Sequence, residues 1–185
     1  MLKKRQVSWE EYQGLVSKIC RDITVSGWRP DYVVGITRGG LLPAKMISYY
    51  FDVPCETLKV SLRDHEQTES NTWMAEDAYG HLRSEQDIKD ETGAAEDNCK
   101  KILIVDDIND TGATLNWIMK DWPESCFPED AVWEDDIWNK NVKFAVIFDN
   151  LSSKFQARID FSGEEINKFE NDVWIDFPYE DWWTK

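Results

Sequence analysis

The sequence predicts an α/β fold in which a twisted parallel sheet is flanked by helices. Short apolar runs without a polar face, at 32–36, 102–105 and 142–148, are typical of strands buried on both sides. Segments with helical spacing of apolar residues separate these runs, and this alternation favours parallel pairing. With 185 residues, the chain is long enough for one domain with its own core, and no linker divides residues 1–185. In such a sheet, ligands bind at the carboxyl ends of the strands.

The first helix is predicted to begin directly after Ser8. Ser8 and Glu11 fit a capping box, and apolar residues then recur at helical spacing from Tyr12 to Ile19. Gly27 and Pro30 should end this helix before strand 32–36 begins.

The later elements continue the alternation. Residues 41–51 are expected to be helical, with Pro43 tolerated in the first turn. A third helix should follow strand 102–105, because the apolar residues from Leu115 to Trp122 recur at helical spacing. Short strands are predicted at 56–62, 158–161 and 172–175.

Two polar, acid-rich segments interrupt the pattern. Residues 63–98 show no sustained period, and a loop of this length inside a compact domain is usually functional or mobile. We therefore expect either a moving active-site flap or a solvated insertion there. Residues 123–140 are predicted to form a second, acidic insertion.

The net charge of −15 limits the partners of the chain. Such a charge disfavours nucleic-acid backbones and anionic membranes as binding partners. Anionic small molecules stay possible, because a local nest of backbone amides can hold phosphate against the overall field. The hydrophobic content of 42% argues against disorder, and the ten tryptophans indicate apolar surface to bury, so we expect a homo-oligomer.

The cysteines and histidines argue against a zinc site. Cys20, Cys55, Cys99 and Cys126 lie far apart without C-x-x-C spacing, and there are only two histidines. The charged start of the chain contains no secretory apolar region, and no run reaches membrane-spanning length. A cytoplasmic, reduced protein is the simplest expectation.

The stretch 101–115, KILIVDDINDTGATL, predicts a phosphate site. Asp106 and Asp107 stand where the buried strand should end, and the short residues 110–114 open the next helix. The free amides and positive dipole end of that helix would form an anion site. Two carboxylates beside a phosphate cradle suit a sugar phosphate with a diol and a metal ion. The alternative is an ordinary strand–turn–helix junction in which Thr111 only caps the helix.

Residues 37–40, TRGG, are a second candidate anion loop. They follow the buried strand 32–36 and precede the helix 41–51. The two glycines permit close backbone approach, and Arg38 could pair with phosphate oxygens. Alone, this tetrapeptide is a weak signal, and the alternative is a plain turn.

Together these motifs resemble the phosphoribosyl-diphosphate (PRPP) signature of type I phosphoribosyltransferases. The chain is most similar to the bacterial xanthine-guanine, or 6-oxopurine, members of that family. The resemblance is carried by TRGG, by the signature, by 64–66 at the start of a flexible loop, and by 174–178, WIDFP. It implies the type I fold with a flexible flap over 63–98 and a small base-binding hood over 150–185. The implied reaction is Mg²⁺-dependent purine salvage, which joins guanine, xanthine or hypoxanthine to PRPP and releases pyrophosphate.

The resemblance also assigns roles to residues. Asp106, Asp107 and Asp110 are expected to be catalytic, with Asp107 also binding the metal. PRPP would be bound by Thr37, Arg38, Gly39, Asp106, Asp107, Asp110, Thr111, Gly112, Ala113 and Thr114. The purine members often carry a non-proline cis peptide in the pyrophosphate loop, which points to the bond between Thr37 and Arg38.

The base pocket is where this chain departs from the family pattern. Trp174 is expected to stack on the base, with backbone groups near Ile175 reading its edge, although Trp174 could also be a core aromatic. Purine members carry a lysine just after the strand that matches 142–148, where this chain has Asp149 and Asn150. Asn150 could donate a neutral hydrogen bond to the base. A transferase for another base, and a PRPP- or nucleotide-sensing protein without turnover, therefore stay open.

Overall fold

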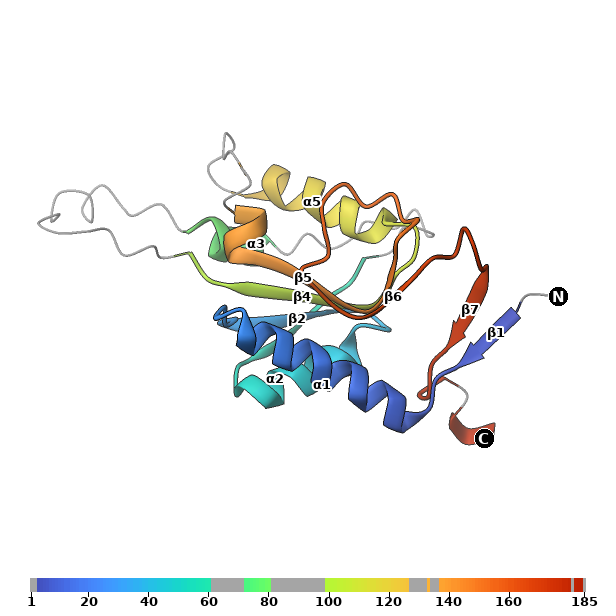
Figure 1. Ribbon diagram of the computed structural model, residues 1–185. Helices are drawn as coiled ribbons and strands as arrows, with labels where there is room; N and C mark the ends of the chain where they lie inside the picture. The colour runs from blue at the N-terminus through green and yellow to red at the C-terminus, as the bar shows by residue number, and fades with distance from the viewer. Residues whose placement is uncertain are drawn as a thin grey trace, which may run out of the picture.

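A five-stranded, fully parallel sheet forms the centre of the protein (Figure 1). The computed structural model describes residues 3–60, 72–80, 99–126, 133, 137–180 and 182–184. The strand order is β3-β2-β4-β5-β6. The bounds are β2 Tyr32–Ile36, β3 Cys55–Leu58, β4 Ile102–Asn109, β5 Val142–Asn150 and β6 Phe161–Ile166. The predicted parallel α/β sheet is confirmed.

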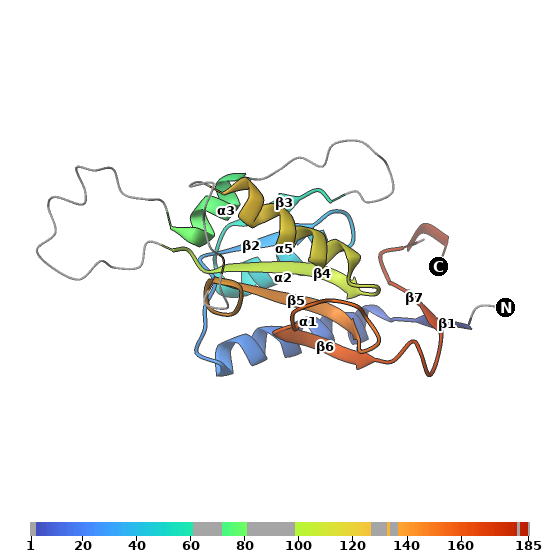
Figure 2. The same cartoon turned by 90° about the horizontal axis from the view of Figure 1, so that it is seen from above.

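Helices cover both faces of this sheet, because its central strands are apolar on both sides. All five residues of β2 are buried. Helices α1 (Trp9–Val25) and α2 (Leu41–Phe51) pack on one face, and α3 (Thr72–Tyr79) and α5 (Ala113–Ser125) pack on the other (Figures 1 and 2). The Ser8 hydroxyl accepts a hydrogen bond from the Glu11 amide at 3.1 Å, so the predicted cap of α1 is confirmed.

Aromatic residues fill the core beneath α5. Trp122 is completely buried, and Trp133 and Trp138 pack against it with ring centroids 6.3 and 6.1 Å away. Trp138 belongs to a short π-helix, η1 (Ile137–Asn141), and stacks on Phe144 of the sheet. Part of the tryptophan content is therefore explained by this core.

A second, two-stranded sheet forms the hood. It pairs β1 (Lys3–Gln6) with β7 (Val173–Asp176) in parallel, and it lies at the carboxyl end of β4 (Figures 1 and 2). A short 3-10 helix, η2 (Trp182–Thr184), follows β7. The hood expected over 150–185 starts later than predicted, because β6 belongs to the main sheet, and it includes an N-terminal strand that was not foreseen.

Other elements also differ from the sequence-based expectations: β3 ends at Leu58, short of the predicted range 56–62, and β4 continues past Val105 to Asn109. The strand predicted at 158–161 runs over Phe161–Ile166 instead, as an edge strand whose burial alternates. Within the proposed flap, residues 72–79 form α3, which buries Met74, Ala75 and Ala78. Residues 61–71 and 81–98 lie outside the described residues, so flap closure stays a prediction. Helix α5 continues through Pro123 to Ser125, because Trp122 and Cys126 on either side of the proline are buried.

Cys20, Cys55, Cys99 and Cys126 all lie among the described residues, and none of them forms a disulfide there. Burial raises the pKa of Cys20 to about 11. Among the helices that the structure describes, none is long and apolar enough to cross a bilayer.

One arginine connects the hood to the main sheet. Arg5 on β1 donates to both carboxylate oxygens of Glu164 on β6, at 2.6 and 2.7 Å, and also pairs with Glu11 on α1. Its guanidinium lies over the ring of Phe148, 5.0 Å from the centroid.

We expect Arg5→Met to lower the free energy of unfolding by about 1–2 kcal/mol, because a two-oxygen, networked ion pair contributes more than an exposed one. Urea titration would measure the change. Lys120→Met is the matched control: its ion pair with Glu124 spans 3.9 Å at an exposed position, and we expect a loss below about 0.5 kcal/mol. Equal losses in the two variants would contradict a stabilising connection through Arg5.

Candidate active site

Two adjacent acids stand near the carboxyl end of β4. The amide of Asp107 donates to Oδ1 of Asp106 at 2.9 Å. Burial raises the pKa of both carboxyl groups, and the charge of Asp107 raises the pKa of Asp106 further. Hydrogen bonds to Asp107 from its surroundings, including one from Tyr179, act in the opposite direction. The pair is thus a desolvated negative site that a cation or hydroxyl donors would stabilise.

The TRGG loop packs directly against these acids. A Cβ at Gly39 would lie 2.0 Å from Oδ2 of Asp107, and one at Gly40 would lie 2.2 Å from the carbonyl oxygen of Val105. A side chain at Gly39 would therefore displace the Asp107 carboxylate, and one at Gly40 would displace backbone atoms. The peptide bond between Thr37 and Arg38 is cis, as the resemblance led us to expect.

The loop after β4 has the geometry of an anion cradle. Gly112, with φ of 83°, is the N-cap residue of α5 and offers no side chain to the first helical amides. The hydroxyl of Thr111 accepts from the Ala113 amide at 3.3 Å. A small cavity of about 70 Å³ lies over residues 108–115. Amides at a helix start beside such a cavity favour an anion.

The segment 153–155, which follows β5, holds the loop after β4 in place through hydrogen bonds and close packing. The amide of Lys154 donates to the Thr111 carbonyl at 3.0 Å, and the Ser153 hydroxyl donates to Oδ1 of Asn109 at 2.9 Å. A Cβ at Gly112 would lie 2.3 Å from the Phe155 amide nitrogen. The loop therefore needs glycine both for its positive φ and for this close approach.

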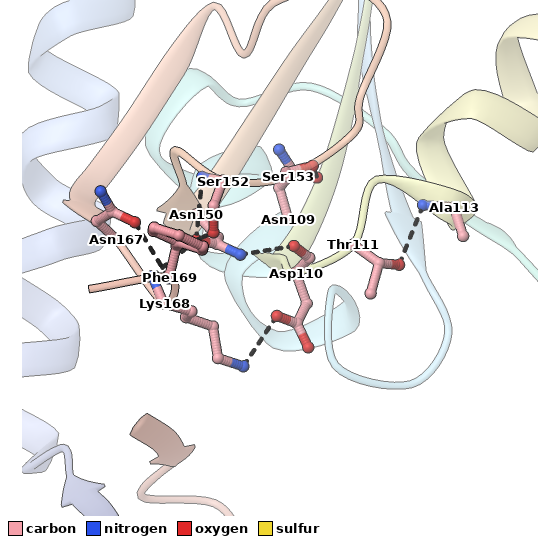
Figure 3. A network of polar contacts seen from close by, with 10 residues as sticks. All are labelled: Asn109, Asp110, Thr111, Ala113, Asn150, Ser152, Ser153, Asn167, Lys168 and Phe169. Atoms are coloured by element: carbon pink, nitrogen blue, oxygen red, sulfur yellow. Dashed lines mark hydrogen bonds and ion pairs between the residues drawn. The ribbon is translucent and has the colours of Figure 1, made fainter. Parts of the chain in front are cut away.

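Asn150 holds together the segments around the site, and its predicted contact with a base stays a prediction. It is 5% exposed, and its side-chain amide donates to the Asp110 carbonyl at 2.8 Å (Figure 3). Its Oδ1 accepts from the amide and hydroxyl of Ser152 and from the Lys168 amide. Both the Nδ2 and the Oδ1 of Asn150 are thus engaged in holding neighbouring segments of the chain.

The same network places a cation on Asp110. The Lys168 ammonium donates to Oδ1 of Asp110 at 2.8 Å, with the lysine side chain only 15% exposed (Figure 3). Among the residues that the structure describes, Asp110 is its single acceptor. An ammonium has three donors, so two are left for other partners. Asn150 thus holds the backbone of the lysine that approaches Asp110.

An open cavity of about 810 Å³ joins the acids, the TRGG loop and the hood. Its walls include Arg38, Asp107, Trp174, Lys4 and Trp183. Trp174 is 49% exposed, so it is not a core aromatic. Asp106 and Thr114 line both this cavity and the smaller one, which makes the two spaces neighbours.

A family model described as "Phosphoribosyl transferase domain" matches residues 2–181 of the chain. The chain belongs to this family. It is therefore a phosphoribosyltransferase, and the match covers nearly the whole sequence.

Two curated relatives of this phosphoribosyltransferase share one description. The xanthine-guanine phosphoribosyltransferase of Cereibacter sphaeroides is 26% identical over 94% of the chain and 85% of the relative. The protein of the same name from Idiomarina loihiensis is 24% identical with the same coverage.

Solved structures show the same fold. The xanthine-guanine-hypoxanthine phosphoribosyltransferase of Helicobacter pylori superposes with a TM-score of 0.63 at 18% identity, over 98% of this chain and 96% of that one. The purine phosphoribosyltransferase of Pyrococcus horikoshii has a TM-score of 0.61 at 20% identity, over 96% and 95%.

Most of the residues predicted for the site of this phosphoribosyltransferase lie together. Residues 37–39, the acid pair and Trp174 line the large cavity, and residues 110–114 line the small one. The side chain of Ile175 is buried in the core, so only its backbone is left to contact a base. The sequence pattern did not indicate Lys168 or Tyr179. Both lie far along the chain from the acids that they contact.

Proposed function

We propose that this enzyme transfers the phosphoribosyl group of PRPP to a 6-oxopurine and releases pyrophosphate. The observation that favours a 6-oxopurine is the ion pair between Lys168 and Asp110. An ammonium with two free donors favours a carbonyl oxygen, which accepts hydrogen bonds, over an exocyclic amino group, which donates them. The names of the two curated relatives, both xanthine-guanine enzymes, support the same class of base.

The two cavities suggest how PRPP would lie. The 5′-phosphate fits the amide cradle at 110–114, and the pyrophosphate fits the loop with Arg38 and Gly39. Asp106 and Asp107, between these two sites, would accept hydrogen bonds from the ribose hydroxyls. Trp174, on the hood, would stack on the base.

The chemistry that follows is displacement at C1 of the ribose. A base nitrogen donates its electron pair to C1, the bond from C1 to the pyrophosphate oxygen breaks, and the proton of the base passes to the Asp110 carboxylate. The ribosyl group develops positive charge on the way, as at other glycosidic centres. Asp106 and Asp107 lie where their charge would stabilise that state.

The donors present also fit a magnesium ion. Mg²⁺ takes one or two carboxylates and completes its shell with water and phosphate oxygens, and Asp107 offers such a carboxylate at the cavity wall. The described residues contain no cluster of three or more histidine, cysteine or acidic side chains that could hold a metal. We therefore expect the ion to bind together with PRPP, where it would neutralise charge on the departing pyrophosphate.

A base panel tests this function. The protein would be incubated with PRPP, Mg²⁺ and guanine, xanthine, hypoxanthine, adenine or orotate, and pyrophosphate release would be measured. We expect release with one or more of the first three bases. Release only with the other bases would overturn the choice of base, and PRPP binding without turnover on any base would indicate a sensor.

We expect Lys168→Met to lower kcat/KM for the preferred 6-oxopurine by about 10- to 100-fold, because a hydrogen bond to a charged donor is lost. The KM for PRPP should change little. Lys168→Arg should recover part of the activity, and Lys120→Met, which removes an exposed lysine, should match the unmodified enzyme. If the unmodified enzyme uses 6-oxopurines and Lys168→Met does so equally well, the role of Lys168 is wrong.

A further inference from the structure

One tyrosine hydroxyl touches both the acid pair and the TRGG loop. The hydroxyl of Tyr179 lies 3.1 Å from Oδ2 of Asp107 and 3.5 Å from the carbonyl oxygen of Gly39. A hydroxyl has a single proton, so the shorter contact, to a carboxylate, is the stronger of the two. Three segments that are distant in the sequence meet at this atom: the pyrophosphate loop, the end of β4 and the chain just beyond the hood.

The ring that carries this hydroxyl is held by the core. It stacks on Phe177 with centroids 5.3 Å apart, and it meets Tyr12 of α1 edge-on at 5.7 Å. The backbone around it is a closed turn. The Glu180 amide donates to the Phe177 carbonyl at 3.0 Å, and the Phe177 amide donates to Oε2 of Glu180 at 3.2 Å. The hydroxyl therefore occupies a fixed place relative to Asp107.

Asp107 is held from two sides as a result. Its Oδ2 faces Gly39, where an added Cβ would lie 2.0 Å away, and it accepts from Tyr179 on the hood side. We propose that Tyr179 is a positioning residue, which orients the Asp107 carboxylate toward the ribose of PRPP and joins the base hood to the PRPP site. This inference rests on the proposed function, because it presumes that Asp107 binds PRPP.

The role predicts that Tyr179→Phe weakens PRPP binding. The phenylalanine ring keeps both aromatic contacts and removes only the hydroxyl. We expect the Kd for PRPP in the presence of Mg²⁺, measured by calorimetry, to rise about 10- to 100-fold, as for loss of a hydrogen bond to a charged group. The KM for PRPP should rise in parallel, while the KM for the base and the Tm stay near those of the unmodified enzyme.

Tyr12→Phe is the matched control. Tyr12 packs against Tyr179 in the same aromatic group, yet its buried hydroxyl has no hydrogen-bond partner among the described residues. Its removal should leave PRPP binding within about twofold and the Tm unchanged or higher, because an unsatisfied buried polar group is lost.

The possible outcomes distinguish failure of the Tyr179 role from failure of the proposed function. If the unmodified protein does not bind PRPP, the proposed function fails, and the role of Tyr179 fails with it. If the unmodified protein binds PRPP and Tyr179→Phe binds equally tightly, the positioning role is wrong and the function stands. A large drop in Tm, with the KM values for PRPP and base rising together, would show a structural residue and would also overturn the proposal.

Discussion

Gly39→Ala should abolish most phosphoribosyl transfer. The added methyl group would lie 2.0 Å from Oδ2 of Asp107, well inside van der Waals contact, so the carboxylate or the TRGG loop must move. A displacement of about 1 Å at a reacting site can lower the rate about 10²-fold, and here the displacement reaches both the acid pair and the pyrophosphate loop. We expect kcat/KM for PRPP to fall by about 10²- to 10³-fold, measured as pyrophosphate release.

Gly14→Ala is the control for this substitution. Gly14 lies within α1, and a Cβ there would meet no atom within 4 Å. Alanine in a helix interior is favoured over glycine by about 0.5–1 kcal/mol, so this variant should be fully active and slightly more stable. Activity in Gly39→Ala close to that of Gly14→Ala would mean that Asp107 and the loop do not need their observed positions.

Asp110→Asn should have the second large effect. The amide keeps the size of the carboxylate and leaves the backbone bond to Asn150 intact, but it cannot take a proton from the base. It also removes the ion pair that holds Lys168. Because positioned acid–base groups typically contribute 10²- to 10⁴-fold, we expect kcat to fall by about that factor while the Kd for PRPP stays within severalfold. Single-turnover kinetics and calorimetry would separate the two quantities.

Asp52→Asn supplies the comparison. Asp52 is exposed at the C-cap of α2 in the left-handed region, which asparagine also tolerates, so this variant should retain full activity. If Asp110→Asn retained turnover like Asp52→Asn, a different group would have to accept the proton.

The central sheet and the phosphate motifs could be predicted because their signals are local. The strand at Tyr32–Ile36 and the helix at Leu41–Phe51 have the predicted bounds, since an unbroken apolar run and a glycine pair define both. The change from apolar to acidic residues after Val105 indicated acids toward the carboxyl end of this strand, although the strand itself continues to Asn109. In each case, the residues that determine the element are neighbours in the sequence.

The missed elements depend on partners elsewhere in the chain. Strand β1, with the sequence KKRQ, has no apolar pattern, and it is a strand because it pairs with β7. Helix α3 is short and is stabilised by burial of Met74 and Ala78 rather than by a periodic face. The contact between Lys168 and Asp110 joins positions 58 residues apart. Such contacts arise from tertiary packing, which a single sequence does not reveal.

The pairing of β1 with β7 has a consequence for how the enzyme becomes active during folding. Lys3 pairs with Val173, so this contact closes almost the whole chain into a loop, and such closures are among the slowest steps of folding. A two-stranded sheet is also marginal by itself and needs the contacts of Arg5 beneath it. The α/β core can therefore be formed before Trp174 and Tyr179 are in place. Catalytic competence would then arrive last in folding and be lost first when the native state opens locally.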